Sequence, residues 1–156
     1  MQKIQRTIDI KAPVQRVYDF VNQPNNLLSI WPNMVSVSNV VARPGGAHDF
    51  DWVFKMVGFH FKGHCAVEEA QSGKFARVRN ESGIPSTFLW TYATNGSGTR
   101  LSLTVEYAMP TPVIGKIAEV LAAKINERDL DNMLANLKDV MEHGTTAVDV
   151  SARAPH

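Results

Sequence analysis

The sequence predicts an α+β protein in which a curved, seven-stranded antiparallel sheet wraps around one long C-terminal helix, with two short helices after the first strand. Three observations lead to this prediction. Apolar residues recur with a period of two from about residue 34 to 108, turn residues divide that region into short segments, and helical spacing follows from 113 to 142. Strands and helices occupy separate parts of the chain, which is typical of segregated layers.

The first segment, residues 2–10, carries Ile4, Ile8 and Ile10 at even spacing and is predicted to be a half-buried strand. Pro13 suits the first turn of a helix because its missing N–H is not needed there. Helical spacing of apolar residues then indicates a short helix to Val21, and a second short helix is expected between 26 and 32.

Six further strands are expected at 34–42, 48–57, 59–70, 74–81, 86–94 and 99–108. The segments between them hold turn formers, for example Gly45 and Gly46 in one and Asn95 to Gly98 in another. Several of these connections are tight hairpins, so the sheet should be antiparallel, and the short connections favour a meander.

The long helix, expected over 113–142, has two apolar faces that do not align. The first face contains Ile114, Ile117, Leu121 and Ile125. The second contains Leu130, Met133, Leu134, Leu137 and Met141, roughly 160° around the helix axis. Three interpretations stay open: a break near 126–129, a lid over a cavity mouth, or an exposed first face that meets a partner or a membrane surface.

Composition limits the function. The chain has 156 residues, 16 Lys+Arg against 15 Asp+Glu, 44% hydrophobic residues and one cysteine. The balanced charge argues against nucleic-acid binding, and one cysteine fits the cytoplasm. The N-terminal residues do not resemble a signal peptide, and no apolar run suits stable membrane insertion. One domain over 1–143 is expected, with a mobile tail over 144–156.

Strand alternation predicts which side chains face inward, because residues of equal parity share one face of a strand. The predicted inward set is rich in large aromatic side chains and contains few polar groups, among them Asn80. Two interpretations stay open, a packed core and a ligand pocket, since pockets are commonly aromatic-lined. The candidate ligand-binding residues are Trp31, Trp52, Phe54, Phe61, Cys65, Asn80, Phe88, Trp90, Tyr92, Tyr107 and Leu121.

The common catalytic motifs are missing, and catalytic residues are not identified. There is no glycine-rich phosphate loop and no paired-cysteine motif. His60 and His64 are four residues apart, but on a strand they would lie about 13 Å apart and could not share a metal ion. Cys65 has apolar neighbours on its face and is expected to be an unreactive, small core residue. No metal and no permanent cofactor are expected.

Three segments resemble the START-like, helix-grip superfamily of the SRPBCC type, which includes polyketide cyclase/dehydrase and lipid-transport proteins. The run from Ile8 to Val21 is similar to the opening of that superfamily. Asn26 to Pro32, with its Trp-Pro ending, is similar to the second short helix, and Gly98 to Tyr107 to the last strand. The resemblance covers about residues 2–142 and implies a deep apolar cavity between sheet and helix. It does not imply one reaction, because the superfamily spans carriers, cyclases and stress proteins.

The favoured hypothesis is that this protein binds a hydrophobic small molecule, such as a lipid, a quinone or a polyketide-like compound, in the cytoplasm. Burial of apolar ligand surface would drive binding. One alternative, which the resemblance permits, is a polyketide cyclase/aromatase or dehydratase that uses Tyr92, Asn80 or Tyr107. Another is a protein-interaction module in which the Ile114–Ile125 face contacts a partner, most simply in a homodimer.

Overall fold

The computed structural model describes residues 1–143 of the protein. The expected tail over 144–156 lies outside the described residues. The strands are β1 (Gln2–Ile10), β2 (Met34–Ala42), β3 (His48–Met56), β4 (Phe59–Gln71), β5 (Phe75–Asn80), β6 (Ser86–Asn95) and β7 (Gly98–Tyr107). The helices are α1 (Val14–Val21), α2 (Leu27–Ile30), α3 (Thr111–Ile114) and α4 (Lys116–Glu142), with a 3-10 turn at Pro24–Asn26.

The seven strands form one antiparallel sheet in the order β1-β7-β6-β5-β4-β3-β2. Strands β2 to β7 follow one another as a meander, and β1 pairs with β7 at the end of the sheet. The fold class and the meander predicted from the turn residues are confirmed, and each predicted strand boundary lies within one residue of the observed one. Short connections keep consecutive strands adjacent in space.

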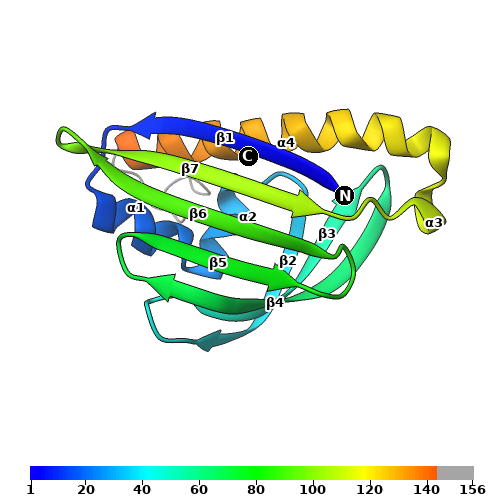
Figure 1. The fold of residues 1–156 in the computed structure, drawn as a ribbon, viewed down its shortest axis with the longest axis horizontal. Helices are drawn as coiled ribbons and strands as arrows, with labels where there is room; N and C mark the ends of the chain where they lie inside the picture. Colours follow the sequence, from blue (N-terminus) through cyan, green and yellow to red (C-terminus); the bar gives the residue numbers. More distant parts are fainter. Residues whose placement is uncertain (144–156) are drawn as a thin grey trace, which may run out of the picture.

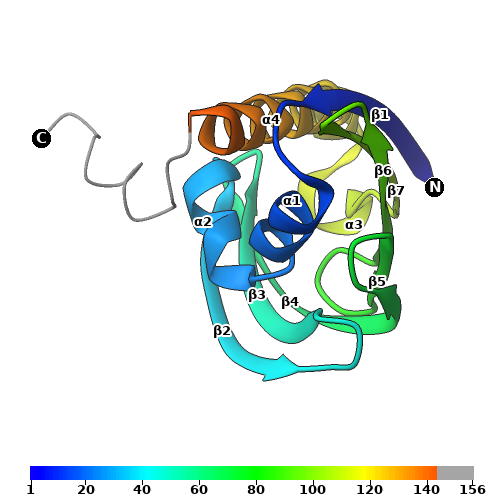
Figure 2. The ribbon, with the colours of Figure 1, turned by 90° about the vertical axis from the view of Figure 1, so that its left-hand side faces the viewer.

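The sheet curves into a trough, and α4 lies along its open side. Figure 1 shows α4 running beside β1, the strand at the end of the sheet. In the end view of Figure 2, the strands from β2 to β7 form a U-shaped wall, α4 spans its opening, and α1 lies across the near end. The curvature leaves an interior between the sheet and α4, and side chains of the helices extend into it.

Residues of α1 pack firmly into that interior. Val17 and Tyr18 have no exposed surface, and the ring of Tyr18 packs against that of Tyr92 from β6, with 5.0 Å between ring centroids. This contact is T-shaped, with 67° between ring planes, a favourable arrangement for aromatic pairs. The helix thereby closes one end of the trough.

The C-terminal helical region is interrupted at Gly115, not near 126–129. Gly115 has φ of +84°, a left-handed conformation that glycine adopts without steric cost. It separates α3 from α4, which then runs without a break from Lys116 to Glu142. The predicted break near 126–129 is therefore wrong, because Asn126 and Asp129, although weak helix formers, are held by hydrogen bonds to Tyr107 and Trp31.

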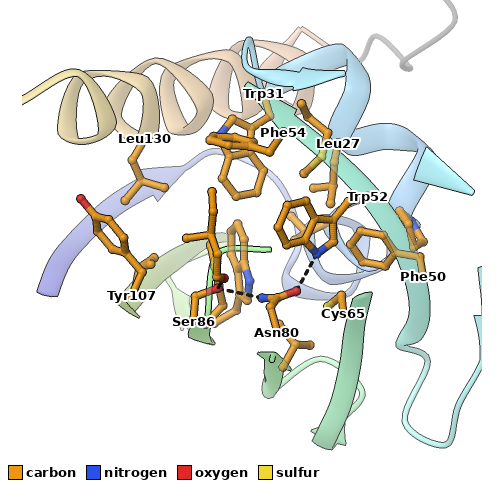
Figure 3. A pocket seen from close by; sticks show the side chains of 18 of the residues that line it. Leu27, Trp31, Phe50, Trp52, Phe54, Cys65, Asn80, Ser86, Tyr107 and Leu130 are labelled. Carbon is orange, nitrogen blue, oxygen red and sulfur yellow. Dashed lines mark hydrogen bonds between the residues drawn. The ribbon is translucent and has the colours of Figure 1, made fainter. Parts of the chain in front are cut away.

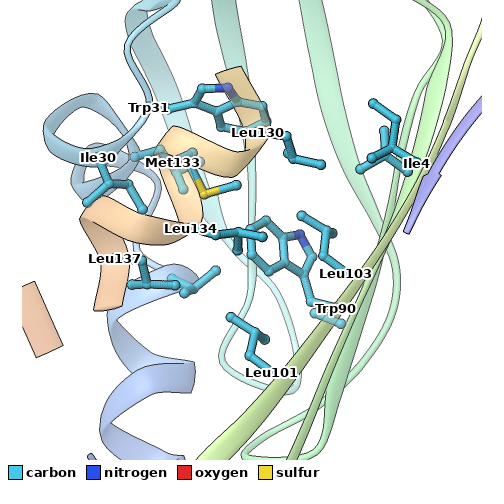
Figure 4. Packing of buried hydrophobic residues seen from close by; sticks show 14 of the residues in the cluster. Ile4, Ile30, Trp31, Trp90, Leu101, Leu103, Leu130, Met133, Leu134 and Leu137 are labelled. Atoms are coloured by element: carbon cyan, nitrogen blue, oxygen red, sulfur yellow. The ribbon is translucent and has the colours of Figure 1, made fainter. Parts of the chain in front are cut away.

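Only the second predicted apolar face of α4 enters the core. Leu130, Met133, Leu134, Leu137 and Met141 are all buried. Figure 4 shows side chains of this face packed against Ile30 and Trp31 on one side and against Trp90, Leu101 and Leu103 of the sheet on the other. Because these residues recur at helical spacing, one face of the C-terminal half of α4 covers the trough.

The first predicted face remains largely exposed. Of its four members, Ile117 is 94% exposed and Leu121 57% exposed, whereas Ile114 and Ile125 are half-buried. Val113 and Val120, which lie beside this face, are also exposed. Figure 1 shows why: α3 and the first turns of α4 project beyond the ends of β1 and β7. An exposed first face agrees with the observed burial, and a lid over the cavity stays a prediction. Within residues 1–143, no helix is long and apolar enough to cross a membrane.

Candidate functional site

An apolar cavity of about 130 Å³ lies inside the trough, between the sheet, α2 and α4. Figure 3 shows Trp31, Phe54 and Leu130 on the side of the helices, and Asn80, Ser86 and Cys65 on the side of the sheet. These side chains point toward one another across the interior. The volume is close to that of engineered apolar cavities of about 150 Å³ that bind benzene.

Aromatic side chains from three elements form the wall nearest α2. The ring of Trp31, which follows α2, meets Phe54 of β3 at 5.6 Å and Phe88 of β6 at 5.7 Å, both edge-to-face. Phe54 and Phe88 lie on separate strands that the curvature of the sheet brings to the same indole. The cavity therefore has a rigid aromatic wall on this side.

A chain of hydrogen bonds crosses the floor of the cavity. Trp52 Nε1 donates to Asn80 Oδ1 over 2.8 Å, and Asn80 Nδ2 donates to Ser86 Oγ over 3.1 Å. The Ser86 hydroxyl in turn donates to the carbonyl oxygen of Ile84 over 3.0 Å. Each of these side-chain groups makes at least one hydrogen bond within the protein, so this chain orients Trp52.

The absence of a side chain at Gly63 leaves space for the indole of Trp52. Trp52 and Gly63 are opposite each other in the β3–β4 register. A Cβ atom on Gly63 would lie 2.2 Å from Trp52 Cζ2 and 2.6 Å from the carbonyl oxygen of Ser82. Only glycine leaves room for the Trp52 indole at this point of β4.

Asp129 of α4 is a buried carboxyl group in the cavity wall. Trp31 Nε1 donates to Asp129 Oδ2 over 2.7 Å. Burial raises the pKa of Asp129 to about 6, against the hydrogen bonds from Trp31 and from the backbone of Asn33, which lower it. A carboxyl group that titrates near neutral pH inside a cavity is suited to proton transfer.

His48 at the start of β3 is a second titratable group in the lining. Its Nδ1 lies 2.7 Å from the carbonyl oxygen of Asn22. Because a carbonyl oxygen only accepts, Nδ1 must carry the proton, and Nε2 of the neutral ring is then an acceptor. The backbone of Asn22 thus fixes the tautomer that leaves a basic nitrogen on the other side of the ring.

Cys65 of β4 also lines the cavity and is 3% exposed. Burial, with a smaller contribution from the charge of Asp49, raises the pKa of the Cys65 thiol to about 12. The thiol is therefore protonated at neutral pH and is a poor nucleophile. It acts as a small apolar group in the wall.

The structure brings eight of the predicted ligand-binding residues together in the cavity wall: Trp31, Trp52, Phe54, Cys65, Asn80, Phe88, Trp90 and Tyr107. Phe61 and Tyr92 are buried in the core outside the lining. Tyr92 instead packs on Tyr18, and its hydroxyl accepts a hydrogen bond from Asn22 Nδ2 over 3.4 Å. The placement of Leu121 in the cavity was wrong, because its part of α4 extends past the sheet.

Sequence reasoning missed the polar residues of the lining that lie outside the strand interiors, namely Asn22, His48, Asn126 and Asp129. Asp129 and Asn126 are three residues apart on α4, with Leu130 beside them, so they share the buried face. That periodicity was a usable signal. It was overlooked because charged residues in a helix ordinarily face water.

No group of three or more histidine, cysteine or acidic side chains within residues 1–143 has the proximity needed to hold a metal ion. His64 lies on the outer surface, where its Nδ1 is 2.6 Å from Asp51 Oδ1. His60 is exposed on the same strand.

Fold and cavity together define a class of protein: a sheet wrapped around a C-terminal helix that encloses an apolar, aromatic-walled cavity. The family model described as "Polyketide cyclase / dehydrase and lipid transport" matches residues 1–142. The chain therefore belongs to this family, as the START-like resemblance predicted.

Solved structures support the fold. A crystal structure of TTHA0849 from Thermus thermophilus is similar with a TM-score of 0.75 and 22% identity, and covers 99% of this chain and 100% of that one. The Zhui aromatase/cyclase from Streptomyces sp. R1128 has a TM-score of 0.74 at 14% identity over 91% and 94% of the two chains. BexL, a di-domain ARO/CYC from the BE-7585A biosynthetic pathway, is similar with a TM-score of 0.66 and 21% identity. The match covers 90% of this chain and 50% of BexL. No curated protein matches the sequence.

Proposed function

We propose that this protein binds a hydrophobic small molecule, of the lipid, quinone or polyketide-like kind, in the cavity between the sheet and α4. The observation that supports this is an apolar cavity of about 130 Å³ with a wall of aromatic side chains. A closely packed protein interior has few voids larger than a water molecule. Binding would be driven by transfer of apolar ligand surface from water to this wall.

The size of the cavity favours a compact ligand. Pockets for drug-sized molecules measure roughly 300–1,000 Å³, and about 130 Å³ is well below that range. A single ring, or one ring-bearing end of a longer molecule, fits this space. A long chain would need side chains of the wall to move.

The tryptophan residues provide a direct test. The chain has three, Trp31, Trp52 and Trp90, and all of them line the cavity. We expect toluene to change tryptophan emission in a saturable way and to give matching isotherms by calorimetry. Native mass spectrometry of freshly purified protein should also detect a retained apolar molecule.

A matched pair of variants separates cavity binding from binding elsewhere. Val78→Phe adds a ring to the cavity wall, and Val53→Phe makes the same change on a strand residue of opposite parity to Trp52 and Phe54. Toluene binding should be lost in the first variant and retained in the second. Equal binding by both folded variants, or no saturable binding by the wild type, would refute the proposal.

A second candidate function is catalysis of a cyclase or dehydratase reaction in the same cavity. The observation that favours it is the presence in the lining of Asp129, with its pKa raised to about 6, and of His48, whose Nδ1 lies against the carbonyl oxygen of Asn22. Such reactions require removal of a proton next to a carbonyl group, and a positioned base contributes roughly 10²–10⁴-fold to such steps.

Proton exchange tests this second function without knowledge of the natural substrate. We expect the protein to accelerate exchange of the α-protons of 1-indanone in D2O, followed by NMR. Asp129→Asn or His48→Gln should reduce the acceleration, and Glu142→Gln, on α4 but outside the cavity lining, should not. Exchange no faster than in buffer, in protein that binds the ketone, would argue against catalysis.

The exposed apolar face of α3 and α4, formed by Val113, Ile117, Val120 and Leu121, favours a further role in contact with a second copy of the chain. Four side chains supply much less than the roughly 800 Å² per partner of a stable interface. A homodimer formed through this face alone would therefore be weak. A cytoplasmic location is part of the proposal, supported by the single cysteine, which is buried.

A further inference from the structure

The side-chain amide of Asn126 lies between two other residues of the cavity wall. Its Nδ2 donates to the hydroxyl oxygen of Tyr107 over 3.1 Å and approaches Met56 Sδ at 3.7 Å. Asn126, Tyr107 and Met56 all line the cavity. Figure 3 shows Tyr107 below α4, at the opposite end of the cavity from Phe50. The amide is therefore part of the inner surface that a ligand would meet.

The other amide atom, Asn126 Oδ1, is buried and accepts no hydrogen bond from any residue in 1–143. It is the sole side-chain oxygen or nitrogen of the described residues in this condition. A buried acceptor without a donor is destabilising, because its hydration is lost and not replaced. Native proteins satisfy almost all such groups, so this one requires an explanation.

The Tyr107 hydroxyl supplies the complementary half of a polar pair. Its oxygen accepts from Asn126, so its own proton remains available for donation. Burial raises the pKa of Tyr107, which keeps that proton in place at neutral pH. An unused acceptor and an unused donor thus lie side by side in a wall that is mostly apolar.

A hydroxyl group matches this pair because it donates and accepts at once. Exchange of Oδ1 and Nδ2 in the amide would not change this match. Tyr107 would then donate to Oδ1, and the unused groups would be the amide N–H and a lone pair of Tyr107. A hydroxyl satisfies either arrangement, whereas an ether oxygen can only accept.

We propose that the ligand of the cavity is an apolar ring compound that carries a hydroxyl group, and that Asn126, with Tyr107, selects it by hydrogen bonds to that hydroxyl. This inference rests on the proposed ligand-binding function and specifies its ligand class. Asn126 is the specificity-determining residue. The aromatic wall supplies affinity for the ring, and the amide–phenol pair decides the position of its one polar group.

Three ring compounds that differ only in this group test the inference by calorimetry: toluene, p-cresol and 4-methylanisole. We expect the wild type to bind p-cresol about threefold to tenfold more tightly than either of the others, which is the usual net effect of one hydrogen bond. Asn126→Leu should retain toluene binding and lose the preference for p-cresol. Asn132→Leu, an exposed position on the same helix, should behave as the wild type.

The outcomes distinguish this inference from the function on which it rests. If the folded wild type binds none of the three compounds, the proposed function fails. If it binds all three equally, or if Asn126→Leu keeps the preference for p-cresol, the function stands and the role of Asn126 is refuted. If Asn126→Leu does not fold, Tyr107→Phe provides a second test of the same pair. Its preference for p-cresol over toluene should be smaller than that of the wild type. An unchanged preference would also refute the inference.

Discussion

Trp31 and Asp129 are joined by a buried hydrogen bond of 2.7 Å from the indole Nε1 to the carboxyl Oδ2. The bond connects the residue after α2 to the middle of α4, 98 positions apart in the chain. Both residues line the cavity. A single polar contact therefore ties the helix that covers the trough to the aromatic wall beneath it.

The pKa of Asp129, raised to about 6 by burial, predicts a pH dependence of stability. At pH values between about 4 and 6 the folded protein holds a proton on this group that the unfolded chain has lost. Stability from this group is therefore fully present below about pH 4 and is lost as the pH rises through about 6, by about 3 kcal/mol at most.

The measurement compares urea unfolding of the wild type and of Asp129→Asn from pH 4 to pH 7. Some acids act in the opposite direction, but equally in both proteins. One is Asp49, where burial raises the pKa but the hydrogen bonds from the Val67 backbone and from Arg43 together lower it. We expect the wild type to lose stability relative to the variant as the pH rises. A difference that does not change with pH would contradict a raised pKa at Asp129.

Gly63→Ala should displace the Trp52 indole. The added methyl group would lie 2.2 Å from Trp52 Cζ2, and overpacking of this kind costs about 1–3 kcal/mol. We expect lower stability and altered tryptophan emission. In a double-mutant cycle, Trp52→Leu should recover part of the loss in the Gly63→Ala background. Additive effects of the two substitutions would show that the two side chains do not compete for space.

The Cys65 thiol should react very slowly with a disulfide reagent such as DTNB. Its pKa, raised from 9.0 to about 12 by burial, reduces the thiolate fraction near neutral pH by about a thousandfold. The reference is His60→Cys in a Cys65→Ala background, an exposed position on the same strand. Comparable reaction rates at the two positions in the folded protein would contradict the predicted burial of Cys65.

Amide exchange should divide α4 into two parts. Between Lys116 and Arg128 only Ala122 is buried, whereas the segment from Asp129 to Met141 contributes seven buried residues. Local opening is easiest where few apolar contacts must break. We expect faster exchange over 117–125 than over 130–141, measured by mass spectrometry. Equal protection along the helix would rule out a mobile first half and with it a lid.

Leu121→Asp should leave the stability of the fold within about 0.5 kcal/mol of the wild type, since the side chain is 57% exposed and lies outside the core. Sedimentation of both proteins then tests contact between two copies through the exposed face. A homodimer held by this face would appear in the wild type and dissociate in the variant. Identical sedimentation of both would exclude a homodimer held by this face.

Local patterns in the sequence were sufficient for the sheet. Alternation of apolar residues, with glycine, proline and asparagine at the turns, determined the seven strands and their antiparallel order, because turn residues and side-chain parity act over a few neighbouring positions. Parity also placed Trp52, Phe54, Phe88 and Trp90 on the inner face. The burial of Leu130 to Met141 followed from helical periodicity in the same way.

The site depended on contacts between distant segments, which parity cannot supply. Whether Tyr92 faces a ligand or the core was decided by Tyr18, which lies 74 positions earlier and packs on its ring. The exposure of Leu121 followed from where the sheet ends relative to α4, and Asp129 became a buried, titratable group because Trp31 covers it. Short-range patterns were enough to assign the layers and their inward faces. Which of those residues enclose space followed from contacts between distant segments, because cavity shape depends on the curvature of the sheet and on the position of the helix across it.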